Sequence, residues 1–151
     1  RPDQALDYIK RMTNSFSYAL PGSIYEVSPD FGMHTQAWNI YSYAYPIVRQ
    51  FFGINPMASE KKVTINPLMP TEWNEASLEN VVVGNNSISI KYARTEGGER
   101  LTITQTDGSF KVAFSLSDQS LEVLSGNEVL KNSMEVVLEG DSIQVLLKKT
   151  N

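Results

Sequence analysis

The chain has 151 residues, enough for one ordinary domain or for one domain with part of another. Hydrophobic residues make up 41% of it, which supports a packed core and argues against disorder. With 13 basic residues, 17 acidic residues, no cysteine and one histidine, the composition argues against a nucleic-acid or anionic-membrane partner, and it excludes disulfides, thiolate metal sites and histidine-rich metal sites.

Two composition regimes meet near Met57–Lys62. Of the 15 aromatic residues, 11 lie before residue 60, where 4 basic and 4 acidic residues balance. The remainder carries 9 basic and 13 acidic residues, and its apolar residues alternate between frequent turn signals. The change predicts an α+β fold with a helical domain over residues 1–59 and an antiparallel β-sandwich over residues 60–151.

The first segment, RPDQALDYIKRM, is not a signal peptide and reads like sequence from inside a protein. No apolar run in the chain reaches the roughly 18 residues that a membrane helix needs. Pro2 suits a first helical turn, and Asp3 complements the positive end of the helix dipole. A stripe of apolar residues predicts a helix from Pro2 to about Ala19, ended by Pro21-Gly22: Ala5, Ile9, Met12 and Phe16.

A second helix is predicted from His34 or Thr35 to about Gly53, with Thr35 as N-cap and Gly53 as C-terminal cap. Pro46 is expected to kink it. Its bulky apolar residues follow a 3-4-3-4 spacing: Trp38, Tyr41, Tyr45, Val48 and Phe52. Because the other faces are apolar too, this helix must be enclosed, and the β region covers only part of it. We expect the rest of the cover from further helices of a larger chain or of a partner.

After Lys62 the apolar period becomes two, and turn signals recur every 8–12 residues, as in a sandwich. Predicted strands are Lys62–Asn66, Leu78–Val83, Ser87–Arg94, Arg100–Thr106, Phe110–Leu116, Ser120–Ser125, Glu128–Lys131, Met134–Leu138 and Ser142–Lys148. Predicted hairpin turns are Gly84-Asn85-Asn86, Glu96-Gly97-Gly98, Asp107-Gly108 and Gly140-Asp141. Phe110 and Phe114 share a strand face with Val112, which places them in the core.

The loop between the two predicted helices holds the candidate site. Glu26 lies in a loop bounded by Gly and Pro, and it has two readings: a general base, or an ordinary loop carboxylate that caps a helix or pairs with an arginine. Between Tyr25 and Val27 we expect the Glu26 carboxylate to be partly desolvated, which raises a carboxyl pKa toward a useful value.

The neighbouring polar and aromatic residues have similar alternatives. Asp30 is either a second carboxylate or part of a Ser-Pro-Asp turn, and His34 either contacts substrate or hydrogen bonds at the helix start. Trp38 is either core or a sugar-stacking platform. Tyr25 and Gln36 complete the set of candidate substrate contacts.

The spacing around this loop resembles a known family. Gly22 to Glu26 (G-x-x-x-E), then Gly32, then Gln36-Ala37-Trp38 opening a long helix, is similar to the last catalytic hairpin of six-hairpin, (α/α)6-barrel glycoside hydrolases. The nearest branches are the amylo-α-1,6-glucosidase (glycogen-debranching-like) and α-L-rhamnosidase-like enzymes. The segment VTINPLMP, Val63 to Pro70, followed by Trp73, resembles the first strand of the β-sandwich that follows such barrels.

The resemblance implies inverting hydrolysis of α-linked glycans by two carboxylic acids, without a cofactor. It places the general base at Glu26 and the general acid on an earlier barrel hairpin that this chain lacks. Ser28-Pro29-Asp30-Phe31 replaces the longer, arginine-containing loop of the debranching branch. The chain then contains the final barrel helices and the trailing sandwich, and its partner is the preceding barrel region of the same protein. A bacterial glycan-degrading enzyme of this kind favours the periplasm or the extracellular space.

Two other readings remain open. The first is a non-catalytic carbohydrate-binding or structural β-sandwich with a helical appendage, although the sandwich half offers only Trp73, Tyr92, Phe110 and Phe114 for sugar contact. The second is a self-association module that buries its helices in a dimer.

Overall fold

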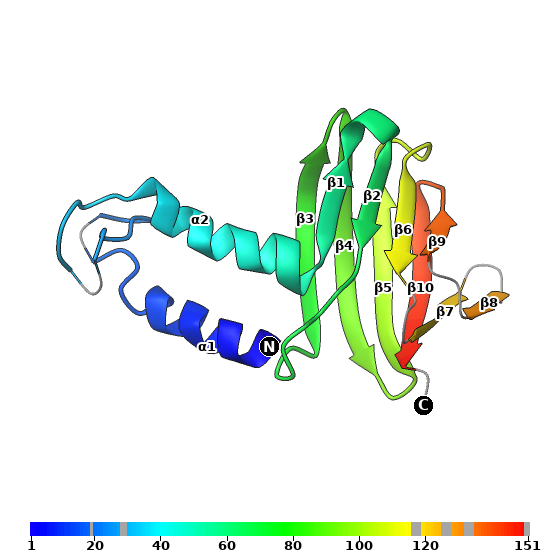
Figure 1. Cartoon of the computed structure of the whole chain (residues 1–151), viewed down its shortest axis with the longest axis horizontal. Helices are drawn as coiled ribbons and strands as arrows, with labels where there is room; N and C mark the ends of the chain where they lie inside the picture. The colour runs from blue at the N-terminus through cyan, green and yellow to red at the C-terminus, as the bar shows by residue number, and fades with distance from the viewer. Residues whose placement is uncertain (19, 28–29, 116–118, 125–127, 132–134, 150–151) are drawn as a thin grey trace. The chain divides into compact units, whose positions relative to one another are not determined.

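The computed structural model describes residues 1–18, 20–27, 30–115, 119–124, 128–131 and 135–149 (Figure 1). The chain divides into two compact units. The helical unit comprises Arg1–Phe51 with Leu68–Glu72, and the sandwich unit comprises Phe52–Pro67 with Trp73–Asn151.

The first helix, α1 (Pro2–Thr13), begins where the sequence predicts. Proline in its first turn needs no hydrogen-bond partner, and Asp3 lies beside the positive end of the helix dipole. Leu6 and Ile9 are its buried side chains, so one narrow apolar face packs within the helical unit.

Helix α1 stops at Thr13, earlier than the predicted end near Ala19. Ala19 itself lies outside the described residues. The Thr13 hydroxyl donates to the carbonyl oxygen of Ile9 at 2.7 Å. Such a bond competes with the backbone bonds of the next turn. Ser17 then takes a left-handed φ of 67°, and its N–H donates to the carbonyl oxygen of Ser23 at 2.7 Å instead of to a helical acceptor.

The second helix, α2 (Ala37–Tyr45), continues as a π-helix over Pro46–Phe51. Its N-cap is Gln36, in extended conformation with φ −123°, and not Thr35 as the sequence suggested. The N–H of Gln36 donates to the carbonyl oxygen of Ile24 at 3.2 Å, which keeps Gln36 out of the helix. Proline cannot donate to the helical ladder, and the change from α to π geometry falls at Pro46, where a kink was predicted.

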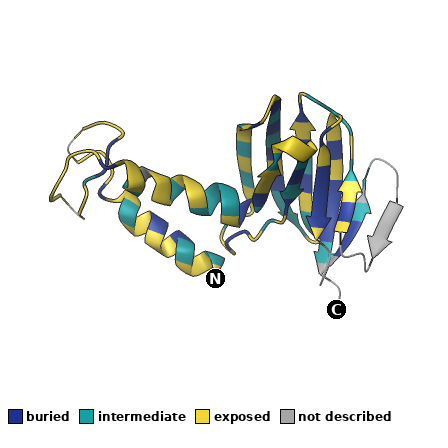
Figure 2. Cartoon of the chain, turned by 45° about the horizontal axis from the view of Figure 1, so that its top comes forward, coloured by how far each residue is buried: buried dark blue, intermediate teal, exposed yellow. Residues whose placement is uncertain are grey.

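The sandwich unit contains two sheets, one lying over the other in Figures 1 and 2. The four-stranded sheet has the order β1-β2-β6-β9: β1 (Ile54–Met57), β2 (Lys62–Ile65), β6 (Lys111–Ser115) and β9 (Glu135–Leu138). The six-stranded sheet has the order β3-β4-β5-β10-β7-β8: β3 (Glu75–Val83), β4 (Asn86–Thr95), β5 (Gly98–Gln105), β10 (Ser142–Lys149), β7 (Gln119–Val123) and β8 (Glu128–Lys131). Only β2 and β6 pair in parallel; the other paired strands that the structure describes are antiparallel.

The predicted alternation of buried and less buried side chains is confirmed in β4 and β5. Ile88, Ile90 and Tyr92 of β4 are buried, as are Leu101 and Ile103 of β5. Phe110 and Phe114, which were predicted to be internal, are buried. Further core residues are Val63, Ile65, Val112 and Val145. Each large apolar side chain buried this way contributes about 1.5–3 kcal/mol of transfer free energy. The predicted strand ends at Leu116, Ser125 and Met134 lie outside the described residues.

Strand β1 was not predicted, because it is short and contains Pro56. Proline is compatible with β1 because that strand lies at the edge of its sheet. Gly53, just before it, has the left-handed φ, 65°, expected of a residue that follows a helix end. A Cβ at Gly53 would lie 1.8 Å from the carbonyl oxygen of Asn66, so only glycine allows β1 to approach β2 here.

Two of the predicted hairpin turns instead connect the two sheets. Asp107-Gly108 joins β5 of the six-stranded sheet to β6 of the four-stranded sheet, and Gly140-Asp141 joins β9 to β10. Turn residues determine the local change of direction, but they do not determine which strands pair afterwards. The other two predicted turns, after β3 and β4, do close antiparallel hairpins.

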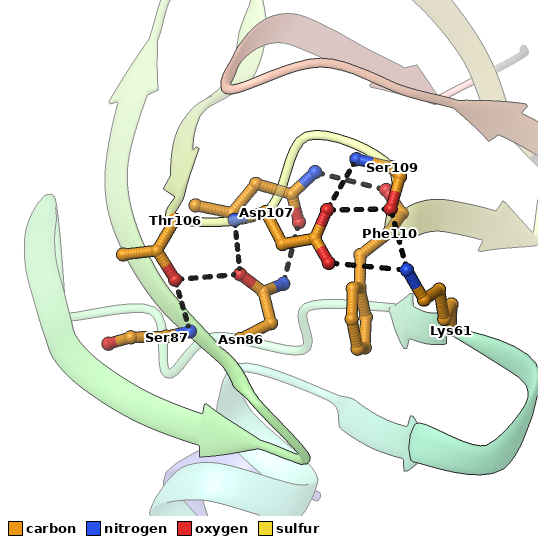
Figure 3. Close-up of polar contacts among 8 residues, drawn as sticks. Lys61, Asn86, Ser87, Thr106, Asp107, Ser109 and Phe110 are labelled. Carbon is orange, nitrogen blue, oxygen red and sulfur yellow. Dashed lines mark hydrogen bonds and ion pairs between the residues drawn. The ribbon is translucent and has the colours of Figure 1, made fainter.

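The side chain of Gln105 hydrogen bonds to both of these inter-sheet connections. Its amide nitrogen donates to the carbonyl oxygens of Phe110 at 3.0 Å and Gly140 at 2.9 Å. Its amide oxygen accepts from Nδ2 of Asn86 at 3.1 Å, and Asn86 accepts from the N–H of Asp107 at 2.9 Å. In Figure 3 the side chain of Asn86 points toward Thr106 and the backbone of Asp107. The network is therefore a structural connection between strands that are distant in sequence.

The carboxylate of Asp107 extends this network to the surface. It accepts from the Ser109 hydroxyl at 2.6 Å and the Ser109 N–H at 3.0 Å, and it lies 3.4 Å from Nζ of Lys61 (Figure 3). The hydrogen bonds from Ser109, with the charge of Lys61, lower the pKa of Asp107 below its ordinary value.

Helices in one unit and two mostly antiparallel sheets in the other make this an α+β chain with a β-sandwich, as the sequence predicts. Within the described ranges, none of the helices has both the length and the hydropathy to cross a membrane.

Candidate functional site

The candidate site is a backbone hairpin in the helical unit, here called the Glu26 hairpin (residues 24–36, of which 28–29 are not described). The N–H of Glu26 donates to the carbonyl oxygen of Met33 at 3.0 Å. Val27 and Phe31 exchange two backbone bonds of 3.0 and 3.1 Å. These bonds fold the segment back on itself and bring Gly32 and Met33 beside Glu26.

The side chain of Glu26 rests on the opposite limb of this hairpin. Its Oε2 accepts from the backbone N–H of Met33 at 3.3 Å. A Cβ at Gly32 would lie 2.8 Å from the same oxygen, so the carboxylate occupies the space above that glycine. Gly32 has a left-handed φ of 83°, which also favours glycine.

The expected partial burial of Glu26 is wrong. Glu26 is exposed, because Val27 is itself half-exposed and Tyr25 is only partly buried. In the described part of the chain no Lys or Arg forms an ion pair with Glu26. Its carboxylate is therefore held by one backbone donor and otherwise open to solvent.

The remaining sequence-predicted site residues are brought together only in part. The rings of Tyr25 and His34 make an edge-to-face contact with centroids 5.4 Å apart. Gln36 is buried at the start of α2, whereas Asp30 and Trp38 are exposed. Among the described side chains, neither Asp30 nor Trp38 hydrogen bonds to Glu26.

Asn39 is the residue that the sequence did not reveal. Its side-chain Nδ2 donates to the carbonyl oxygens of Tyr25 at 2.5 Å and of Glu26 at 3.1 Å. Asn39 lies in the first turn of α2, so this amide attaches the Glu26 hairpin to the helix. An asparagine in a helical segment gives no signal of such a contact.

The helical unit also presents an unusual amount of apolar surface. Trp38 and Tyr41 on α2 are 66% and 60% exposed, and Tyr45 follows on the same face. Of the large apolar side chains that the structure describes as exposed, all except Val82 and Val137 belong to this unit: Tyr8, Phe16, Tyr18, Leu20, Val27, Phe31, Met33, Trp38, Tyr41, Tyr45 and Leu68. In Figure 2, exposed and intermediate residues predominate along both helices. The aromatic face of α2 that Trp38, Tyr41 and Tyr45 share is therefore a candidate interaction surface.

A shallow depression of about 190 Å³ lies elsewhere in the helical unit, and none of the predicted site residues lines it. Its polar groups are already paired: Asp3 accepts from the N–H and hydroxyl of Thr71 at 2.6 and 2.9 Å, and Lys10 pairs with Glu72 at 2.5 Å. The described residues hold no group of three His, Cys, Asp or Glu side chains suited to a metal ion.

Comparison with protein-family models, with curated proteins and with solved structures found no match to this chain. The resemblance to six-hairpin glycosidases therefore depends on the residues of the Glu26 hairpin, the start of α2 and the strand that begins near Val63.

Proposed function

We propose that the chain is the C-terminal part of an inverting glycoside hydrolase that acts on α-linked glycans, with Glu26 as its general base. The observation that carries the proposal is the presentation of Glu26. Its carboxylate is exposed, accepts a hydrogen bond from the N–H of Met33, and forms no ion pair in the described part of the chain. The hairpin that carries it leads into the aromatic helix α2. A base must be held in place and must remain able to accept a proton, and this arrangement meets both needs.

In the proposed reaction, a water molecule attacks the anomeric carbon while Glu26 accepts a proton from that water. The bond between the anomeric carbon and the leaving oxygen breaks, and a carboxylic acid on the opposite side protonates that oxygen. We assign this acid to an earlier helical hairpin of the same protein. Tyr25, Asp30, His34, Gln36 and Trp38 are the candidate contacts to the sugar hydroxyls and ring faces.

The exposed aromatic face of α2 supports the same assignment. Beyond Trp38, the exposed rings of Tyr41 and Tyr45 leave a stripe that one more packed layer of helices would cover. In the proposed protein the preceding helices of an (α/α)6 barrel form that layer, and α1 and α2 are the last helices of the barrel.

A glycan-binding sandwich without catalysis is the alternative, and the positions of the aromatic residues count against it. Tyr92, Phe110 and Phe114 are buried inside the sandwich unit and offer no surface to a sugar, and the remaining candidate, Trp73, is only partly exposed. Calorimetric titration of the 151-residue chain with α-linked oligosaccharides should give no binding isotherm, whereas a binding module would give one.

The stereochemistry of the product tests the proposed mechanism. Proton NMR of α-1,6-glucosides and α-L-rhamnosides treated with the intact protein should show the β-anomer as the first product released. Initial release of the α-anomer would exclude an inverting mechanism. The 151-residue chain alone should give no turnover, because it lacks the general acid; turnover by this chain alone would contradict the proposal.

A further inference from the structure

The position of the Glu26 carboxylate depends on two contacts that come from outside its own residue. On the backbone side, Nδ2 of Asn39 bridges the consecutive carbonyl oxygens of Tyr25 and Glu26 at 2.5 and 3.1 Å. On the side-chain side, Gly32 and the N–H of Met33 form the surface on which the carboxylate rests.

One of these contacts restrains the backbone at Glu26, and the other restrains the end of its side chain. Asn39 fixes the backbone at Glu26, because one amide holds the peptide oxygens on both sides of its Cα. The Met33 N–H fixes the end of the side chain, and the missing Cβ of Gly32 leaves the room in which Oε2 lies. Asn39 is half-buried in the first turn of α2 and its own N–H donates to the carbonyl oxygen of Gln36 at 3.2 Å, so it moves with the helix.

We propose that Asn39 and Gly32 are positioning residues for Glu26, so that α2 presets the carboxylate against the sugar. This inference rests on the proposed role of Glu26 as general base. Preset geometry matters because a displacement of about 1 Å at a reacting group can lower the rate about 100-fold. Neither residue touches substrate in this assignment.

The test uses Asn39→Asp, which keeps the shape but replaces the donor by an acceptor facing two carbonyl oxygens, and Gly32→Ala, which places a methyl group 2.8 Å from Oε2. The control is Gly140→Ala in the sandwich unit, where φ is also positive, at 134°, and an added Cβ meets nothing closer than 3.9 Å. In the intact protein, both hairpin variants should lower kcat about 10- to 100-fold with KM nearly unchanged, while the control keeps the wild-type kcat.

A second measurement on the 151-residue chain does not require activity. In the wild type, the amide proton of Met33 should have the downfield chemical shift of a hydrogen-bonded N–H, and Glu26→Ala should move that shift upfield. Asn39→Asp and Gly32→Ala should move the Met33 shift in the same direction, and Gly140→Ala should leave it unchanged.

The outcomes separate the two proposals. If Glu26→Gln is inactive but both hairpin variants keep the wild-type kcat and the Met33 shift, Asn39 and Gly32 are not positioning residues. If the Met33 shift responds as expected but Glu26→Gln retains activity, the hairpin holds Glu26 as described and the general-base assignment fails, and the catalytic part of this inference with it. A loss of kcat that only follows the fraction of unfolded protein also overturns the positioning role.

Discussion

Replacing Gln105 by leucine tests the inter-sheet connection of the sandwich unit. The change removes three hydrogen bonds and leaves three partners unpaired: Nδ2 of Asn86 and the carbonyl oxygens of Phe110 and Gly140. An unsatisfied buried polar group costs about 1–3 kcal/mol. Two of these groups belong to fully buried residues and the third to a half-buried one, so we expect a loss of about 3–5 kcal/mol. That is a large share of the 5–15 kcal/mol, roughly, that stabilises a typical domain.

Urea unfolding followed by circular dichroism measures this loss. With an m-value of about 2 kcal/mol/M, the Gln105→Leu midpoint should fall by about 1.5–2.5 M. The matched control is Thr104→Val, which changes the exposed neighbouring side chain of β5 and should stay within about 0.5 kcal/mol of the wild type. Equal midpoints for the two variants would refute the reasoning, because they would show that the hydrogen bonds of the Gln105 amide contribute nothing to the free energy of unfolding.

Three further outcomes follow from single positions. Gly53→Ala should prevent stable folding, since its Cβ would collide with the carbonyl oxygen of Asn66; a soluble variant with the wild-type circular dichroism spectrum would contradict this. Tyr43→Phe should leave thermal stability unchanged or raise it by up to about 1 kcal/mol, because the buried Tyr43 hydroxyl has no hydrogen-bond partner in the described part of the chain. Burial and the hydrogen bond to Glu99 raise the pKa of Tyr92 from 10.0 to about 12. The contribution of the neutral Tyr92 hydroxyl to the free energy of unfolding is complete below pH 10 and is lost as the pH rises through 12. Tyr92→Phe should therefore weaken the fall in stability at alkaline pH, measured by a series of unfolding curves.

Apart from β1, the strands were predictable because the signal that predicts a strand is local. Ile88, Ile90 and Tyr92 alternate with polar residues, and the same alternation places them in the core. The pairing of the strands was not predictable in the same way. Asp107-Gly108 carries an ordinary turn signal, yet the strand that follows it joins the other sheet, a choice made by contacts between distant parts of the chain.

The helix ends show the same limit. Thr35 has the side chain of an N-cap, but the backbone bond from Gln36 to Ile24 determines where α2 begins. The end of α1 similarly depends on the N–H of Ser17, which bonds to Ser23 beyond the helix. These partners come from the fold of the intervening loop, so apolar periodicity extends the predicted helix too far.

The candidate site was predictable from its residue types and not from its contacts. Glu26 is conspicuous as a carboxylate in a loop bounded by Gly and Pro. The amide that holds it belongs to Asn39, which bonds to carbonyl oxygens 14 and 13 residues earlier in the chain, and no local pattern indicates that pair. The exposure of Glu26 was also missed, because neighbours in sequence such as Val27 do not cover it.

The kinetic effect of Glu26→Gln in the intact protein tests the central claim most directly. The substitution removes the proton acceptor and keeps the shape, so kcat for an α-linked substrate should fall by about 10²–10⁴. Glu79→Gln, at an exposed carboxylate on β3, should keep the wild-type kcat, and both variants should keep the wild-type circular dichroism spectrum. A Glu26→Gln protein that hydrolyses the substrate as fast as the Glu79→Gln protein would contradict the assignment of Glu26 as the general base.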